Sequence, residues 1–103
     1  MVDIIKAHIS EISVLCDKYN VARLEVFGSA TDPALFDEEK SDLDFLVEFS
    51  PLPEGCHADN YFDLFFALKE VFHKDVDLVM GSAIKNVYFL EAIEKHRELI
   101  YAN

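Results

Sequence analysis

Tryptophan is absent from the chain, and cysteine, glycine, proline and basic residues are scarce. The two cysteines, Cys16 and Cys56, lie far apart, and no CxxC or HxxxH spacing accompanies them. We therefore expect reduced thiols, no disulfide and no zinc site. Nine lysines and arginines stand against twenty aspartates and glutamates, which gives a net charge of -11. Because binding to a bare phosphate backbone requires clustered cations, free nucleic acid is not an expected partner.

Long apolar runs are also absent. No stretch approaches the ~20 apolar residues that span a bilayer, and Asp3, Lys6 and His8 interrupt the N-terminal segment, which is unlike a signal peptide. We therefore expect a cytoplasmic protein that does not contact a membrane. Apolar residues nevertheless make up 51% of the 103 residues and include nine phenylalanines, so a packed core is expected. A chain of this length favours one domain, residues 1–103.

Hydrophobic periodicity predicts six elements in the order αββαβα. Apolar residues recur at spacings of three and four between Asp3 and Asn20, as in an amphipathic helix. The run Val21 to Phe27 predicts a strand that Gly28 stops, and residues 42–49 predict a central strand because their middle is apolar on both faces. The remaining elements are a helix from about Asp59 or Asn60 to His73, a strand from Asp75 to Met80 and a helix from Asn86 to about Tyr101.

The predicted loop between the first two strands, residues 30–41, is too short for a helical crossover of ordinary length. Helices interleaved with a few strands then favour a small mixed β-sheet backed by helices, of the α/β or α+β class. The helix that ends near His73 carries an aromatic set, which we interpret as core packing rather than as a platform for stacking bases. The set comprises Tyr61, Phe62, Phe65, Phe66 and Phe72.

Two aspartates open the second predicted strand. Asp42 and Asp44 are two residues apart, so period-two alternation points both carboxylates to the same side. Like charges this close repel each other, and a bound divalent ion removes that cost. Carboxylate oxygens suit Mg²⁺ or Mn²⁺, and Mg²⁺ typically binds one or two carboxylates together with phosphate oxygens and water. The pair therefore points to a metal site that binds a nucleotide.

Gly28 and Ser29 follow the first predicted strand. A residue without a side chain lets backbone amides approach a phosphate closely there, and the serine hydroxyl adds a donor. A lone Gly-Ser pair is usually a turn, so the specificity comes from its combination with Asp-x-Asp and a further aspartate on a later strand. Asp75 and Asp77 share one face of that later strand, and spacing alone does not choose between them.

Three segments together resemble the nucleotidyltransferase signature of polymerase-beta-like enzymes, and the best match is to the minimal nucleotidyltransferase branch. The segments are Val26-Phe27-Gly28-Ser29, Ser41-Asp42-Leu43-Asp44-Phe45-Leu46-Val47 and Val76-Asp77-Leu78-Val79. Residues 86–93 and 97–101 are also similar to the usual ending of that branch. The resemblance therefore covers nearly the whole chain.

The resemblance implies a two-metal site for phosphoryl transfer. Asp42, Asp44 and Asp77 would bind two Mg²⁺ ions, or Mn²⁺, while the Gly-Ser pair holds the triphosphate of ATP or another nucleoside triphosphate. The resemblance favours Asp77 over Asp75 as the third carboxylate. In that role it would accept or orient the proton of the attacking hydroxyl as pyrophosphate leaves.

The resembled branch is commonly paired with a helical HEPN-type protein, as the antitoxin that neutralises or AMPylates its toxin. For this chain the resemblance implies transfer of AMP from ATP to a HEPN-type partner, within a homo- or hetero-oligomer. The small size of the chain and its net charge of -11 agree with an acceptor that another protein supplies.

One departure from the family pattern supports an alternative. Residues 30–36 lack the arginines that frequently follow Gly-Ser, so Lys40 or a residue from another chain would have to balance the triphosphate charge. The alternative hypothesis is a binding module that binds nucleotide weakly or not at all and neutralises a helical partner by occlusion. Modification of a small molecule, such as an antibiotic, is less favoured because we expect no acceptor domain.

Overall fold

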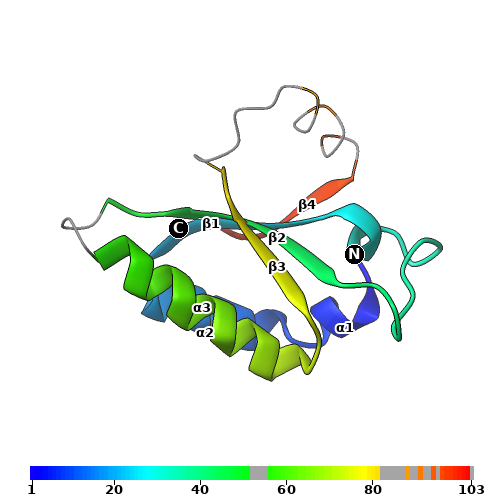
Figure 1. Cartoon of the computed structure of the whole chain (residues 1–103), viewed down its shortest axis with the longest axis horizontal. Coiled ribbons are helices and arrows are strands. Elements are labelled where there is room, and N and C mark those ends of the chain that lie inside the picture. The colour runs from blue at the N-terminus through cyan, green and yellow to red at the C-terminus, as the bar shows by residue number, and fades with distance from the viewer. Residues whose placement is uncertain (52–55, 82–87, 89–90, 92–93, 95, 103) are drawn as a thin grey trace.

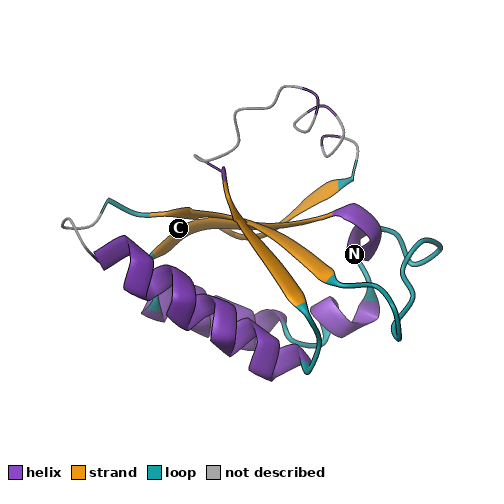
Figure 2. Ribbon diagram, in the orientation of Figure 1, coloured by secondary structure: helices purple, strands orange, loops and turns teal. Residues whose placement is uncertain are grey.

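The computed structural model describes residues 1–51, 56–81, 88, 91, 94 and 96–102. Within these residues, the helices with defined bounds are α1 (Asp3–Lys6), α2 (Ile9–Lys18), the short 3-10 helix η1 (Gly28–Thr31) and α3 (Cys56–Phe72). The strands are β1 (Val21–Phe27), β2 (Leu43–Phe49), β3 (Val76–Met80) and β4 (Arg97–Ala102). Figures 1 and 2 show α1, α2 and α3 on one side of the sheet. Among the described helices, none has the length and apolar character to cross a membrane.

The four strands form one mixed sheet in the order β3-β2-β1-β4. β1 pairs antiparallel with β2 and β4, whereas β2 pairs parallel with β3. α3 lies in the crossover that this parallel pair requires. β2 is a central strand, as the sequence predicted, with Leu43, Phe45 and Val47 fully buried. The predicted small mixed sheet backed by helices is confirmed.

The end of the chain departs from the predicted order αββαβα. The backbone is helical at positions 88, 91 and 94, but Arg97–Ala102 forms β4 instead of continuing a helix to Tyr101. The other residues predicted for this helix, among 86–96, lie outside the described part apart from His96. β4 gives β1 a second antiparallel neighbour, and Ile100 packs against the core. Cross-strand pairing and burial outweigh a local helical period here.

A buried carboxylate ties β4 to β1. Glu25 on β1 is 4% exposed and accepts hydrogen bonds from Nε of Arg23 at 2.9 Å and Nε of Arg97 at 2.8 Å. Two guanidinium groups therefore compensate its charge, one from its own strand and one from β4. Without Arg97, the buried carboxylate of Glu25 would lose its ion-pair partner from β4.

The helix predicted for residues 3–20 is divided into α1 and α2 by a turn at His8, whose φ is -116°. Nδ1 of His8 lies 2.8 Å from the carbonyl oxygen of Ile4. The turn lies between Ile5 on α1 and Ile12 on α2, and both of these side chains are fully buried. The helical prediction is correct over most of the range and wrong in treating it as one helix.

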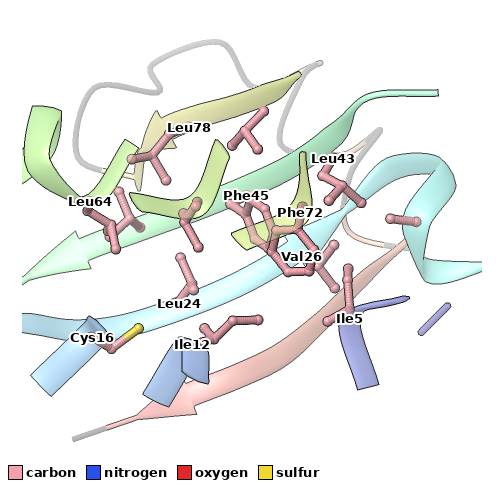
Figure 3. Close-up of a cluster of buried hydrophobic side chains, with 14 of the residues drawn as sticks. Ile5, Ile12, Cys16, Leu24, Val26, Leu43, Phe45, Leu64, Phe72 and Leu78 are labelled. Atoms are coloured by element: carbon pink, nitrogen blue, oxygen red, sulfur yellow. The ribbon is translucent and has the colours of Figure 1, made fainter. Parts of the chain in front are cut away.

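The core lies between the sheet and α2 and α3 (Figure 3). α3 begins at Cys56, earlier than the predicted start at Asp59 or Asn60, and directs Leu64, Leu68 and Phe72 into this core. Phe45 of β2 stacks on Phe72 with ring centroids 6.0 Å apart.

The aromatic set on α3 is only partly in the core. Phe72 is buried, and Tyr61 and Phe65 pack against the core from its border. Phe62 and Phe66, in contrast, are 54% and 62% exposed, so the prediction that the whole set packs in the core is wrong for this pair. Positions 62 and 66 fall outside the stripe that faces the sheet, and composition alone does not reveal that difference.

The hydroxyl of Tyr61 on α3 donates a hydrogen bond to the carbonyl oxygen of Leu78 on β3. Tyr61→Phe keeps the ring but leaves that carbonyl without this donor. We expect the free energy of unfolding to fall by about 1 kcal/mol. Urea denaturation followed by circular dichroism would measure the change as a lower midpoint at an unchanged slope, and an unchanged midpoint would contradict it.

Candidate active site

The turn after β1 places Gly28 directly against Asp44. Gly28 has a φ of +75°, a left-handed conformation that glycine adopts without steric cost. A Cβ atom built at this position would lie 2.8 Å from Oδ2 of Asp44. The backbone register agrees, because Phe27 of β1 pairs with Asp44 of β2. Gly28 is therefore required both by its backbone conformation and by the space that the Asp44 carboxylate occupies.

Two hydrogen bonds hold this turn in place. The amide of Gly28 donates to the carbonyl oxygen of His96 at 2.9 Å, just before β4 begins. The hydroxyl of Thr31 donates to the carbonyl oxygen of Gly28 at 2.8 Å. Ser29 is the next residue and lies in η1. The Gly-Ser turn is thus fixed by contacts on both sides at the end of the sheet that carries the aspartates.

Asp44 lies at the centre of a group of acidic side chains. Asp44 of β2 and Asp77 of β3 are direct partners in the parallel register, and Asp42 precedes β2. Burial, followed by the charges of Asp77 and Asp42, raises the pKa of Asp44 from its ordinary 3.8 to about 6. Asp42 and Asp77 are exposed, whereas Asp44 is partly buried. The structure therefore brings Asp42 and Asp77, both named from the sequence, within electrostatic range of Asp44.

The position of Asp75 differs from that of Asp77. Asp75 precedes β3, and its Oδ1 lies 3.9 Å from Nζ of Lys69. The charges that raise the pKa of Asp44 are those of Asp77 and Asp42. This geometry favours Asp77 as the third member of the acidic group, because its charge faces Asp44 whereas Asp75 faces a lysine.

The oxygen-only donor set fits a hard divalent cation. Two neighbouring negative charges oppose ionisation of Asp44, and a cation between them would offset that repulsion. Within the described ranges, no group of three acidic, histidine or cysteine side chains converges closely enough to enclose a metal on its own. The aspartates therefore fit an ion such as Mg²⁺, which takes part of its coordination from phosphate and water.

A polar cavity of about 520 Å³ lies beside Asp42. Its lining includes three lysines, Lys40, Lys69 and Lys74, and four acids, Glu38, Glu39, Asp42 and Asp75. Lys74 also donates to the carbonyl oxygen of Glu38. The sequence suggested only Lys40 as a cation near the aspartates. The other two come from the end of α3 and the turn after it, and only the three-dimensional fold brings them to Asp42.

Two other residues near the site were not identified from the sequence. Thr31 caps the Gly28 turn, and its only sequence signal is a hydroxyl three residues after Gly28. Tyr61 is predicted from the sequence to pack in the core. In the structure, burial and the charge of Asp77 raise the pKa of its hydroxyl. Its position beside β3 depends on the packing of α3 and has no local signal.

The shifted pKa of Asp44 predicts a pH dependence of stability. Because the folded pKa lies above the unfolded one, the free energy of unfolding should fall as pH rises from about 4 to about 6 and then level off. Solvent screening of this partly exposed group limits the effect to the order of 1 kcal/mol. Asp44→Asn should remove this contribution and exceed the wild type in stability above about pH 6.

Chemical denaturation of both proteins across this pH range, in the presence of a metal chelator, would check the prediction. The difference between wild type and variant isolates Asp44 from the other titrating acids. A difference that stays constant from about pH 4 to about pH 7 would contradict the raised pKa.

The chain matches the family model described as polymerase beta, nucleotidyltransferase, over residues 10–103. It is 37% identical over 99 residues to a Methanocaldococcus jannaschii protein named "Putative protein adenylyltransferase", covering 96% of this chain and 91% of that protein. A solved structure described as a "putative minimal nucleotidyltransferase" has a TM-score of 0.73 and 26% identity, over 94% of this chain and 95% of that one. A chain from the complex of tri-AMPylated Shewanella oneidensis HEPN toxin with MNT antitoxin shares the fold. Its TM-score is 0.64 at 15% identity, over 95% of this chain and 72% of that chain.

The family match includes the Gly-Ser turn and the aspartates on β2 and β3. The relative from M. jannaschii extends the similarity over nearly the full length of both chains. The predicted resemblance to polymerase-beta-like nucleotidyltransferases is therefore confirmed, and the minimal branch provides a matching structure. The chain belongs to the polymerase beta nucleotidyltransferase family.

Proposed function

We propose that this nucleotidyltransferase transfers AMP from ATP to a HEPN-type partner protein, with Mg²⁺ as the metal. The observation that carries the proposal is the position of Asp44, enclosed between the Gly28 turn and Asp77, with its pKa raised to about 6. A carboxyl group whose ionisation is opposed in this way is typical of a site that binds a cation. The name of the M. jannaschii relative supports adenylyl transfer to protein.

Asp42, Asp44 and Asp77 are the residues that would hold one or two Mg²⁺ ions, or Mn²⁺. When bound, the metal would supply charge stabilisation for the phosphates of the nucleotide. A cation at this site would favour the ionised form of Asp44, whose pKa is raised without it. Asp44 and Asp77 lie on two neighbouring strands, so the sheet rather than a loop fixes the distance between them.

The Gly28 turn binds the triphosphate in this proposal. The absence of a side chain at Gly28 leaves the space that the Asp44 carboxylate occupies, and the hydroxyl of Ser29 supplies a hydrogen-bond donor for a phosphate. The lysines of the cavity beside Asp42 supply the positive charge that arginines often supply after the Gly-Ser pair. They would compensate the departure from the family pattern, since Lys40, Lys69 and Lys74 line one cavity together with Asp42.

Asp77 acts on the attacking hydroxyl of the acceptor. The hydroxyl oxygen forms a bond to the α-phosphorus, and the bond from that phosphorus to the bridging oxygen of the β-phosphate breaks, which releases pyrophosphate. Asp77 orients the hydroxyl and accepts its proton. Its exposure to solvent leaves it accessible to an acceptor that approaches from outside the chain.

The acceptor is a second protein. The complex of AMPylated HEPN toxin with MNT antitoxin shares the fold of this chain, which supports a HEPN-type acceptor. The excess of acidic residues suits an encounter with a basic protein surface. In an occlusion mechanism, in contrast, the complex would form and control the partner without nucleotidyl transfer.

Incubation of this protein with Mg²⁺, ATP labelled on the α-phosphate and a HEPN-type protein encoded beside it would test the proposal. We expect label on the partner and release of unlabelled pyrophosphate. ATP labelled on the γ-phosphate is the matched control and should leave the partner unlabelled. A stable complex without transfer of α-label would exclude the proposed activity and favour occlusion.

A further inference from the structure

Phe62 and Phe66 form an exposed aromatic pair on α3. They are four residues apart on a 17-residue helix, so their side chains lie on the same outward side. Each ring contacts a neighbour on the border of the core: Phe62 packs edge-to-face on Tyr61 at 5.3 Å, and Phe66 on Phe65 at 5.4 Å. The pair is therefore supported from beneath and held in place while its outer surface faces solvent.

Acidic residues accompany the pair along the helix. Asp59 and Asp63 lie three residues before Phe62 and Phe66, respectively, and Glu70 lies four residues after Phe66, spacings that place neighbours together on a helix surface. All three acids are exposed. Lys69 also lies three residues after Phe66, but its ammonium group lies over the Phe65 ring and 3.9 Å from Oδ1 of Asp75. This outward side of α3 therefore presents two aromatic rings beside three acids and one lysine that is already paired.

We propose that the Phe62–Phe66 pair is the centre of a docking surface for a basic amphipathic helix of a partner protein. An apolar ridge on such a helix would cover the two rings, and lysines or arginines beside the ridge would approach Asp59, Asp63 and Glu70. A second copy of this chain is a poor occupant because it would bring another net charge of -11 to the same acidic surface. An anionic membrane is disfavoured for the same reason.

The exposed surface of the Phe62–Phe66 pair is enough for the energetic centre of an interface but not for a whole interface. A phenylalanine has roughly 150–250 Å² of surface to bury, and about half of it is still exposed here for each ring. A stable interface buries about 800 Å² on each partner, with a few aromatic anchors inside a polar rim. The pair and its acidic neighbours provide such anchors and part of such a rim.

This inference deepens the proposed function by giving the protein acceptor a place to bind, and it relies on that function only for the kind of partner. Docking at Phe62 and Phe66 is separate from the chemistry of the aspartates, since Asp42, Asp44 and Asp77 lie on or just before β2 and β3. Lys69, the α3 residue that lines the cavity beside Asp42, is not part of the docking surface. Binding and transfer can therefore be tested independently.

The probe is a fluorescent helical peptide with leucines along one face and lysines beside them, compared with a peptide in which glutamates replace the lysines. Fluorescence anisotropy would measure the dissociation constants for wild type and for Phe62→Ser/Phe66→Ser. We expect the lysine peptide to bind wild type at least about tenfold more tightly than the glutamate peptide. The double substitution should weaken lysine-peptide binding at least about tenfold. Leu35→Ser, at an exposed leucine outside α3, is the matched control and should bind as wild type does.

The proposal would be overturned if wild type and the double variant bound the lysine peptide equally, or if wild type did not bind it. It would also be overturned if light scattering showed a wild-type dimer that the double substitution dissociates. Circular dichroism and urea denaturation would verify that the double variant is folded. The Asp42→Asn/Asp44→Asn variant should retain binding of the lysine peptide. Loss of peptide binding in this variant would place the docking surface at the aspartates instead. Absence of label transfer would refute the proposed function alone and leave the peptide result unaffected.

Discussion

Asp42→Asn combined with Asp44→Asn is expected to reduce nucleotidyl transfer at least ~10³-fold, equivalent to about 4 kcal/mol of transition-state stabilisation. Asparagine has nearly the shape of aspartate but lacks the charge that binds a metal. The variant should remain folded, because the substitution removes repulsion around Asp44 and buries no new charge. Transfer of α-label to the partner protein, measured as an initial rate at saturating ATP, is the appropriate readout.

Asp75→Asn is the matched control for this experiment. It makes the same chemical change on an exposed aspartate two residues from Asp77, but its carboxylate faces Lys69 instead of Asp44. We expect transfer within about fivefold of wild type, since a surface ion pair contributes about 1 kcal/mol at most, which corresponds to about fivefold in rate. A loss in Asp75→Asn equal to that in the double variant would contradict the assignment of Asp77 as the third carboxylate.

Gly28→Ala is expected to impair both stability and transfer. The backbone at Gly28 is left-handed, which costs an alanine about 1–2 kcal/mol, and the added methyl group would lie 2.8 Å from Oδ2 of Asp44. The carboxylate or the turn must therefore move. A misplacement of about 1 Å in an active site can lower the rate about 100-fold, so we expect the rate of nucleotidyl transfer to fall about 100-fold. Thermal unfolding and initial-rate measurements on the same preparation would report the two effects.

Gly81→Ala provides the comparison. A Cβ atom at Gly81 would lie 3.1 Å from Oε1 of Glu48, which is the end of a flexible and exposed side chain. That side chain can move aside, so we expect near wild-type transfer and a change in stability within about 0.5 kcal/mol. If the two glycine variants behaved alike, the close approach of Gly28 to Asp44 would not be important for activity.

The local elements of the site could be predicted because their signals are contained in short segments. Alternation in residues 42–49 identifies β2 and places both of its aspartates on one side. The turn at Gly28 follows from an apolar run that ends in glycine. The preference for Asp77 over Asp75, in contrast, depends in the structure on the register between β2 and β3, and the sequence provided it only through resemblance to a family.

The errors concern contacts between distant segments. Residues 97–101 have an apolar spacing that is compatible with a helix, but pairing with β1 and the ion pair from Arg97 to Glu25 make them a strand. Phe62 and Phe66 differ from the buried aromatics of α3 in their place in the helical period, and grouping all five aromatics by composition overlooked that difference. The cavity with three lysines also combines residues from separate parts of the chain.

The hydrogen bond from Gly28 to His96 has a consequence for the order in which the protein forms during synthesis. A nascent chain that has emerged as far as β3 already contains every aspartate of the site, but β1 still lacks β4 and the Gly28 amide lacks its acceptor. Contacts between such distant residues form late and slow the folding of mixed sheets. The Gly28 turn is thus completed after the acidic group, so a ribosome-bound chain would carry the carboxylates before it had fixed the turn that we propose for the triphosphate.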